Sequence, residues 1–237
     1  MNKYRFLLGV LICMCMFYIY THNYSRVYVV AGMREWSVIR SYDNSNEAAE
    51  LLNSVNVTMI MFFRYIKNKY HIDQTDDINE NVDQTNAQTS DQTNAQTSDQ
   101  TNAQTDAQMI VQNILINYNP DTFYENDPRY TSETSYTVNK GDSMYVCLRQ
   151  KDDPTKLMDK DTTLFVMLHE VAHIGNYNGW GHDDRYWTVF KFILQEAVAA
   201  GIYTPIDYAL QPKNYCGLKI TYQPIDDKTL PPIIGAL

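Results

Sequence analysis

The sequence has no excess of basic residues and few cysteines. Its formal net charge is −9, and residues 109–237 carry 16 acidic against 11 basic side chains. Because nucleic-acid binding depends on Lys and Arg neutralising phosphates, this balance argues against a nucleic-acid partner. Two of the four cysteines, Cys13 and Cys15, lie in one apolar stretch, and Cys147 and Cys216 are far apart with no C-x-x-C pair. A cysteine zinc site is therefore excluded, while a Cys147–Cys216 disulfide and two free thiols both remain open.

Long apolar runs are also scarce, with one exception near the N-terminus. Phe6–Tyr20 is uncharged and apolar, and Lys3 and Arg5 precede it. The run is short for a spanning helix, which needs about 20 residues, and a cleaved signal peptide has a similar pattern. The residues after it lack a small-x-small cleavage site, which favours an uncleaved anchor. We therefore expect residues 1–24 to form a single-pass membrane anchor, with the rest of the chain on the non-cytoplasmic side of a host or virion membrane.

Aromatic residues are missing from one internal segment. An eight-residue unit, Asp-Gln-Thr-Asn-Ala-Gln-Thr-Ser, starts at Asp83, repeats at Asp91, and recurs with a changed last residue at Asp99. Such a polar segment cannot bury enough apolar surface to offset its ordering entropy. We expect a disordered insertion at about 72–108 inside one domain that spans residues 25–237.

Outside this insertion, hydrophobic periodicity predicts a mixture of helices and short strands. Asn44 and Glu47 are spaced for a capping box at the start of a long helix. The expected elements are one or two strands in 26–40, a helix over 44–70, a short helix over 109–118, a loop over 119–135, strands at 136–138 and 143–149, a helix over 183–200, and an irregular tail over 202–237 with at most one strand near 218–222.

The pattern His-Glu-x-x-His is the most informative motif in the chain. His169 and His173 lie four residues apart, so on a helix both imidazoles project from the same face and can bind one zinc ion. Glu170 lies next to them as a candidate general base. Apolar residues around the motif would bury the helix, with Asp161 as its N-cap and Gly175 as a residue of positive φ at its end.

A third zinc ligand should follow the glycine-rich turn 176–181. His182 is the expected ligand, because three protein ligands leave the fourth position of a catalytic zinc site open. Glu196 on the following helix is an alternative, as are Asp183 and Asp184.

Other segments could contribute to the site. The strand 143–149 alternates in polarity, and an exposed strand there could pair with an extended peptide through Tyr145, Val146, Cys147 and Leu148. Tyr203, Asp207 and Tyr208 follow the last helix closely, and one of them could stabilise charge at the metal site or orient a ligand.

The run Leu164–His173, followed by Gly181-His182-Asp183-Asp184-Arg185-Tyr186-Trp187, resembles the WLM and SprT-like zinc metallopeptidases, in which a third histidine leads into an aromatic-rich helix. The resemblance is closest to the WLM-like metallopeptidases of large DNA viruses, and Tyr-Val-Cys-Leu-Arg at 145–149 and Gly-Ile-Tyr-x-Pro-x-Asp-Tyr at 201–208 are part of it. It implies one zinc ion held by His169, His173 and His182, with Glu170 as the base.

Together these observations predict an α+β, zincin-like single domain, with a small mixed or antiparallel sheet packed on the His-Glu-x-x-His helix. The expected function is a membrane-anchored zinc metalloprotease, with a protein or peptide as its substrate. One alternative is a catalytically inactive zincin-fold structural or interaction protein of a membrane or virion. Another is a DNA–protein crosslink protease, which would need a basic surface that this chain lacks.

Overall fold

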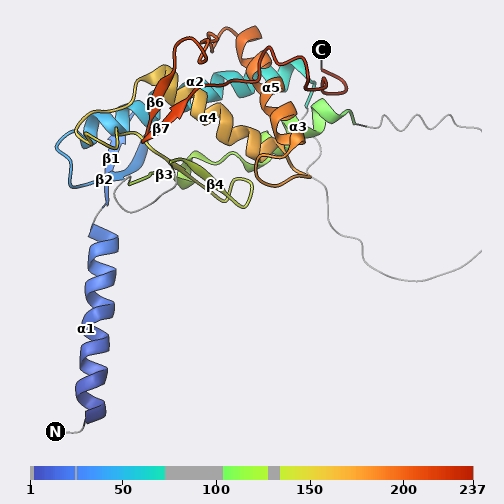
Figure 1. Cartoon of the computed structure of the whole chain (residues 1–237). Helices are drawn as coiled ribbons and strands as arrows, with labels where there is room; N and C mark the ends of the chain where they lie inside the picture. The colour runs from blue at the N-terminus through green and yellow to red at the C-terminus, as the bar shows by residue number, and fades with distance from the viewer. Residues whose placement is uncertain (1–2, 25, 73–103, 128–133, 237) are drawn as a thin grey trace, which may run out of the picture.

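A computed structural model of the chain describes residues 3–24, 26–72, 104–127 and 134–236 (Figure 1). Most of the predicted insertion therefore lies outside the described residues. Its last part, however, is ordered, because helix α3 (Asp106–Asn117) starts before the expected position. Thr105 caps this helix in a capping box with Gln108, which supplies partners to the first N–H groups of the helix.

Five short strands form one mixed sheet. The strands are β1 (Arg26–Ala31), β2 (Arg34–Ile39), β3 (Phe123–Glu125), β4 (Tyr136–Val138) and β5 (Ser143–Val146), and their spatial order is β1-β2-β3-β5-β4. The β1–β2 and β5–β4 pairs are antiparallel, whereas β3 pairs in parallel with both β2 and β5. The segment expected to be a loop over 119–135 thus contributes a central strand, preceded by the short helix η1 (Pro120–Thr122).

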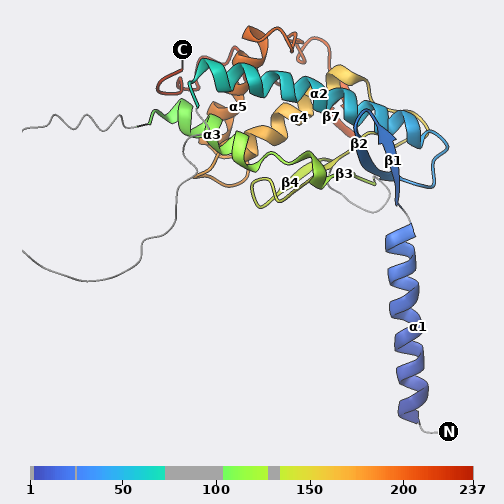
Figure 2. The same cartoon turned by 180° about the vertical axis from the view of Figure 1, so that it is seen from behind.

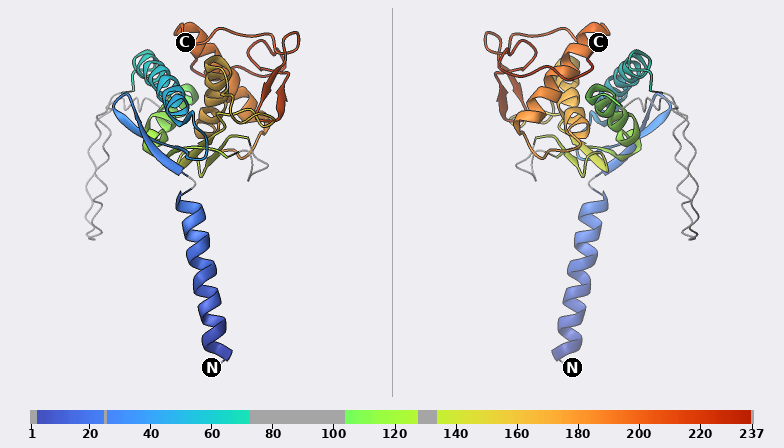
Figure 3. Two further views of the ribbon diagram at one scale, coloured as in Figure 1. Left: turned by 90° about the vertical axis from the view of Figure 1, so that its left-hand side faces the viewer. Right: turned by 90° about the vertical axis from the view of Figure 1, so that its right-hand side faces the viewer.

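Helices cover one face of this sheet, and the apolar core lies between the two layers (Figures 1, 2 and 3). The helices are α2 (Ser45–Lys69), α3, α4 (Lys160–Gly175) and α5 (Asp184–Ala199). Helix α4 is central and buried on nearly all sides, which explains its apolar sequence. The described residues therefore form a mixed α+β arrangement around one core, as the sequence predicted.

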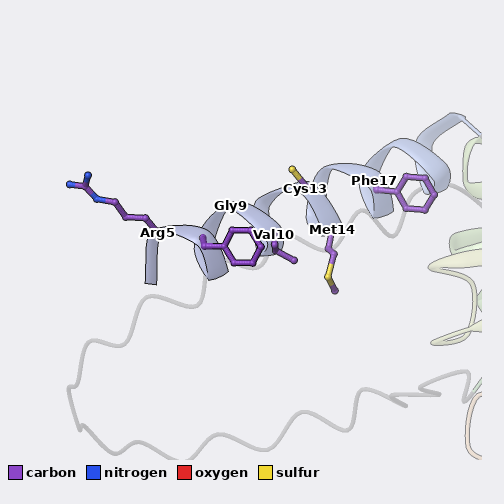
Figure 4. Close-up of a pocket in the computed structure, with 7 residues that line it drawn as sticks. Arg5, Gly9, Val10, Cys13, Met14 and Phe17 are labelled. Carbon is purple, nitrogen blue, oxygen red and sulfur yellow. The ribbon is translucent and has the colours of Figure 1, made fainter. Parts of the chain in front are cut away.

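Helix α1 (Lys3–Tyr24) projects away from the other elements (Figures 1 and 3). No helix among the described residues is long and apolar enough to cross a membrane, so the predicted anchor at residues 1–24 and the membrane location inferred from it were wrong. A shallow pocket on α1 is lined by residues of this one helix, among them Arg5, Cys13 and Phe17 (Figure 4).

Several predicted helix ends differ from the observed ones. Asn44 precedes α2, but its side chain makes no capping hydrogen bond and instead accepts one from the guanidinium of Arg149. Asp159 caps α4 in place of Asp161, accepting hydrogen bonds from the backbone N–H and the hydroxyl of Thr162, both at 2.8 Å. Gly175 is the last residue of α4 and does not have a positive φ. A Cβ atom there would come within 3.0–3.2 Å of side chains on α3 and α5, so close helix packing is what requires glycine.

The C-terminal tail holds a two-stranded hairpin, β6 (Lys213–Tyr215) and β7 (Leu218–Ile220), where at most one strand was expected. A disulfide between Cys147 and Cys216 fixes this hairpin to the end of β5, which resolves the alternative left open by the sequence. The Tyr215 hydroxyl donates to the backbone carbonyl of Cys147 at 2.8 Å and lies 2.6 Å from the Ser135 hydroxyl. The tail is thereby attached beside β4 and β5.

Candidate metal centre

Three histidines converge at one end of α4. His169 and His173 come from successive turns of α4, and His182 lies just before α5. One ring nitrogen of each histidine lies within 4.8 Å of the others, and the Nε2 atoms of His169 and His182 are 3.0 Å apart. Two donors of a tetrahedral zinc ion with Zn–N bonds of about 2.0–2.1 Å are separated by about 3.4 Å, so this group is close to the size that zinc requires.

The electrostatics of the histidines also fit metal binding. Burial and, to a lesser extent, the neighbouring His173 and His182 together lower the pKa of His169 to about 3. Burial, followed by the effects of His182 and Lys140, lowers the pKa of His173 to about 4, and burial also lowers the pKa of His182. Neutral imidazole is the form that coordinates metals. Three clustered imidazoles that resist protonation are therefore ready to act as ligands.

The loop between α4 and α5 is held in place by a lysine from the β4–β5 turn. The ammonium group of Lys140 donates to the backbone carbonyl of Asn176 at 2.5 Å and to that of Gly179. The Asn176 side chain in turn donates to Asp183, which caps α5. These contacts fix both ends of the segment that carries His182, and Lys140 also lies 5.2 Å from the ring of Trp180.

Tyr186, on the first turn of α5, packs beneath all three imidazoles. Its ring stacks on His173 at a centroid distance of 4.3 Å and lies 4.6 Å from the ring of His182. Its hydroxyl donates to the backbone carbonyl of His169 at 3.3 Å. Because Tyr186 is fully buried, it restricts the movement of the three histidine rings that it contacts.

Glu170 lies beside the histidines in a buried position, with 2% of its surface exposed. Burial raises the pKa of its carboxyl to about 7, against the opposing effect of a hydrogen bond from Thr137. The Thr137 hydroxyl is on β4 and lies 2.8 Å from Oε2 of Glu170. A carboxyl group whose pKa is near neutrality can both accept and donate a proton.

The alternative ligands of the sequence analysis lie elsewhere or have other partners. Glu196 forms an ion pair with Lys69 at 2.8 Å and accepts a hydrogen bond from Tyr70 at 2.9 Å. Asp183 caps α5, and Asp184 is exposed in the first turn of that helix. In the part of the chain that the structure describes, the group that could hold a metal consists of the three histidines.

The residues expected to assist from the tail do not hydrogen-bond to the histidine group. Tyr203 donates to the side chain of Gln223 at 3.0 Å, and Asp207 accepts from backbone N–H groups of its own turn. Tyr208 packs against Phe165. Thr137, Lys140 and Tyr186 contact the site, and none of them was predicted as a site residue from the sequence. The aromatic helix and the strand pattern indicated their elements, but no local signal placed their side chains.

The expected substrate strand also needs a correction. Tyr145 and Val146 belong to β5, which lies between β3 and β4, and β3 pairs with both residues. Tyr145 also pairs with β4, and the peptide N–H of Cys147 donates to Ser135. Cys147 and Leu148 are both fully buried. The segment therefore does not offer a free edge. In the described part of the sheet, β4 is the outermost strand on the side that packs against α4.

Comparisons with known proteins give relatives without an assigned activity. No protein-family model matches the chain. It is 36% identical over 101 residues to an uncharacterised protein of Acanthamoeba polyphaga mimivirus, and the aligned residues cover 42% of this chain and 49% of that protein. It is 37% identical over 86 residues to an uncharacterised protein of Invertebrate iridescent virus 3, covering 36% of this chain and 51% of that one. The chain thus spans about half the length of the curated relatives it matches, and these relatives are viral proteins.

One solved structure is similar at a low level. The crystal structure of Wss1 from Saccharomyces cerevisiae aligns with 69% of this chain and 88% of its own, at 15% identity and a TM-score of 0.40. This likeness is too weak to support an argument about activity.

Proposed function

We propose that this chain is a zinc-dependent peptidase in which His169, His173 and His182 hold one zinc ion and Glu170 is the general base. The observation that carries the proposal is the convergence of three imidazole nitrogens beside a buried carboxyl group. Three protein ligands leave a coordination position open, as catalytic zinc sites require. When bound, zinc supplies Lewis acidity for the activation of water and the polarisation of a carbonyl group.

Residues of the protein carry out proton transfer and hold the ligands in position. The Glu170 carboxylate accepts a proton from the attacking water and returns it to the amine that leaves. A pKa near 7 suits both transfers, because the group holds its proton neither too tightly nor too loosely at neutral pH. Tyr186 and Lys140 keep the three imidazoles and the loop of His182 in position.

A peptide substrate would pair with β4. This strand is the outermost one of the described sheet and packs against α4, and Thr137 on it reaches Glu170. An extended peptide added to such an edge gains main-chain hydrogen bonds, which do not depend on its side chains. The substrate of the proposed peptidase is therefore an unfolded or extended protein segment.

The test uses the full chain after reconstitution with zinc. We expect about one zinc ion per chain, and cleavage of an unfolded protein such as reduced casein that stops when zinc is chelated. The Glu170→Gln variant should keep its zinc and lose at least a hundredfold in kcat. The His173→Ala variant should lose both zinc and activity. Chains that bind no zinc would exclude the proposed function and favour a structural role, and cleavage that survives Glu170→Gln would exclude the proposed mechanism.

A further inference from the structure

We propose that Thr137 is the positioning residue of the general base, and that it fixes one oxygen of Glu170 so that the other faces the reacting water. This inference rests on the proposed function and adds to it a residue outside the His-Glu-x-x-His motif. It starts from the contact at 2.8 Å between the Thr137 hydroxyl and Oε2 of Glu170.

The two oxygens of the Glu170 carboxyl have different surroundings. Oε2 accepts the hydrogen bond from Thr137, whereas no hydrogen bond from the described residues reaches Oε1. A carboxylate has about four acceptor sites, and in a buried position each oxygen needs a partner. With Oε2 held by the protein, Oε1 is the atom left to accept a hydrogen bond from water. Proton transfer requires this geometry before it requires a suitable pKa.

Thr137 is suited to hold the carboxyl in a fixed position. It lies on β4, where it pairs with Met144 of β5, so the strand ladder fixes its backbone. Its β-branched side chain has restricted χ1 freedom, which keeps the hydroxyl aimed at α4. The same hydroxyl lies 3.5 Å from the backbone carbonyl of Glu170. The contact joins residues 33 positions apart in the chain and connects the edge strand directly to the base.

Two substitutions at Thr137 distinguish the effect of its hydroxyl from the effect of its branched shape. Thr137→Val keeps the branched shape and removes the hydroxyl, whereas Thr137→Ser keeps the hydroxyl. Thr58→Val is a matched control, because the buried Thr58 hydroxyl donates to the backbone carbonyl of Ser54 within α2, away from the histidines.

We expect Thr137→Val to lower kcat about 10- to 100-fold, because a hydrogen bond to a charged group is lost and the base is free to turn. KM should change less than twofold, since the backbone edge of β4 is unaltered. Thr137→Ser should stay within about threefold of the wild-type kcat, and Thr58→Val should not differ from wild type. Zinc content and the thermal midpoint, measured for every variant, establish that each one is folded and loaded.

Crystal structures of the metal-free proteins give a readout that does not depend on activity. Glu170 should occupy one rotamer in the wild type and in Thr137→Ser, and more than one in Thr137→Val. A Thr137→Val kcat within twofold of wild type, or equal losses in the Val and Ser variants, would overturn the positioning role while leaving the peptidase intact. A wild-type chain without zinc-dependent cleavage would overturn both proposals.

Discussion

The general base of the proposed peptidase should reduce the stability of the metal-free protein, and Glu170→Gln tests this. Burial raises the pKa of Glu170 from 4.5 to about 7. Between these two pH values the folded state binds more protons than the unfolded state, so stability falls as pH rises. Above pH 7 the full cost is present. The difference between a pKa of 4.5 and one of about 7 corresponds to about 3.5 kcal/mol, since one pKa unit is about 1.4 kcal/mol.

Glutamine has the shape of protonated glutamate and does not ionise. We therefore expect metal-free Glu170→Gln to be more stable than wild type at pH 8, by up to about 3.5 kcal/mol, and close to it in stability near pH 4.5. Urea unfolding in EDTA at pH 4.5, 6 and 8 measures the difference. A natural active site that gains stability when its base is removed is a known trade-off between stability and function.

Glu196→Gln is the control for the removal of a buried carboxylate. Glu196 is paired with Lys69 and Tyr70, so its loss should destabilise the protein at pH 8, opposite in sign to Glu170→Gln. The reasoning about Glu170 would be refuted by a Glu170→Gln variant that is less stable than wild type at pH 8. A difference that stays constant between pH 4.5 and 8 would refute it equally.

Three further changes test the surroundings of the site. Glu125→Gln should lower the free energy of unfolding by about 3–5 kcal/mol in urea titrations, because it leaves the fully buried Arg149, 2.5 Å away, without its counter-charge; a loss below about 1 kcal/mol would contradict this. Reduction of the Cys147–Cys216 disulfide, which closes a loop over a sequence separation of 69, should cost about 4 kcal/mol in the same assay, and unfolding curves that coincide with and without reductant would count against it. Lys140→Met should weaken zinc affinity about tenfold in a competition titration with a chelator, since two loop carbonyls lose their donor, and unchanged affinity would show that the loop is held without it.

The helical parts of the chain were largely predictable from local patterns. The long periodic segment 44–70 forms α2, and the helix expected over 183–200 is α5. Local patterns failed to predict the structure where one sequence pattern is compatible with two different structures. The apolar run Phe6–Tyr20 has the composition of an anchor, yet no helix among the described residues is long and apolar enough to cross a membrane. The segment 119–135 has the composition of a loop, yet it contains the three-residue β3, which is too short to produce an alternating pattern.

The sequence by itself determined the pair His169 and His173 and the position of Glu170 beside them, because the geometry of an α-helix places residues four apart on one face. Only the tertiary structure decided which residues join them. The loop that carries His182 is fixed by Lys140, and the base is reached by Thr137 from a strand 33 residues earlier. Such contacts depend on the path of the chain, which places β4 and the β4–β5 turn next to the helix layer. No residue spacing encodes that path, since many sequences with the same local patterns could fold along others.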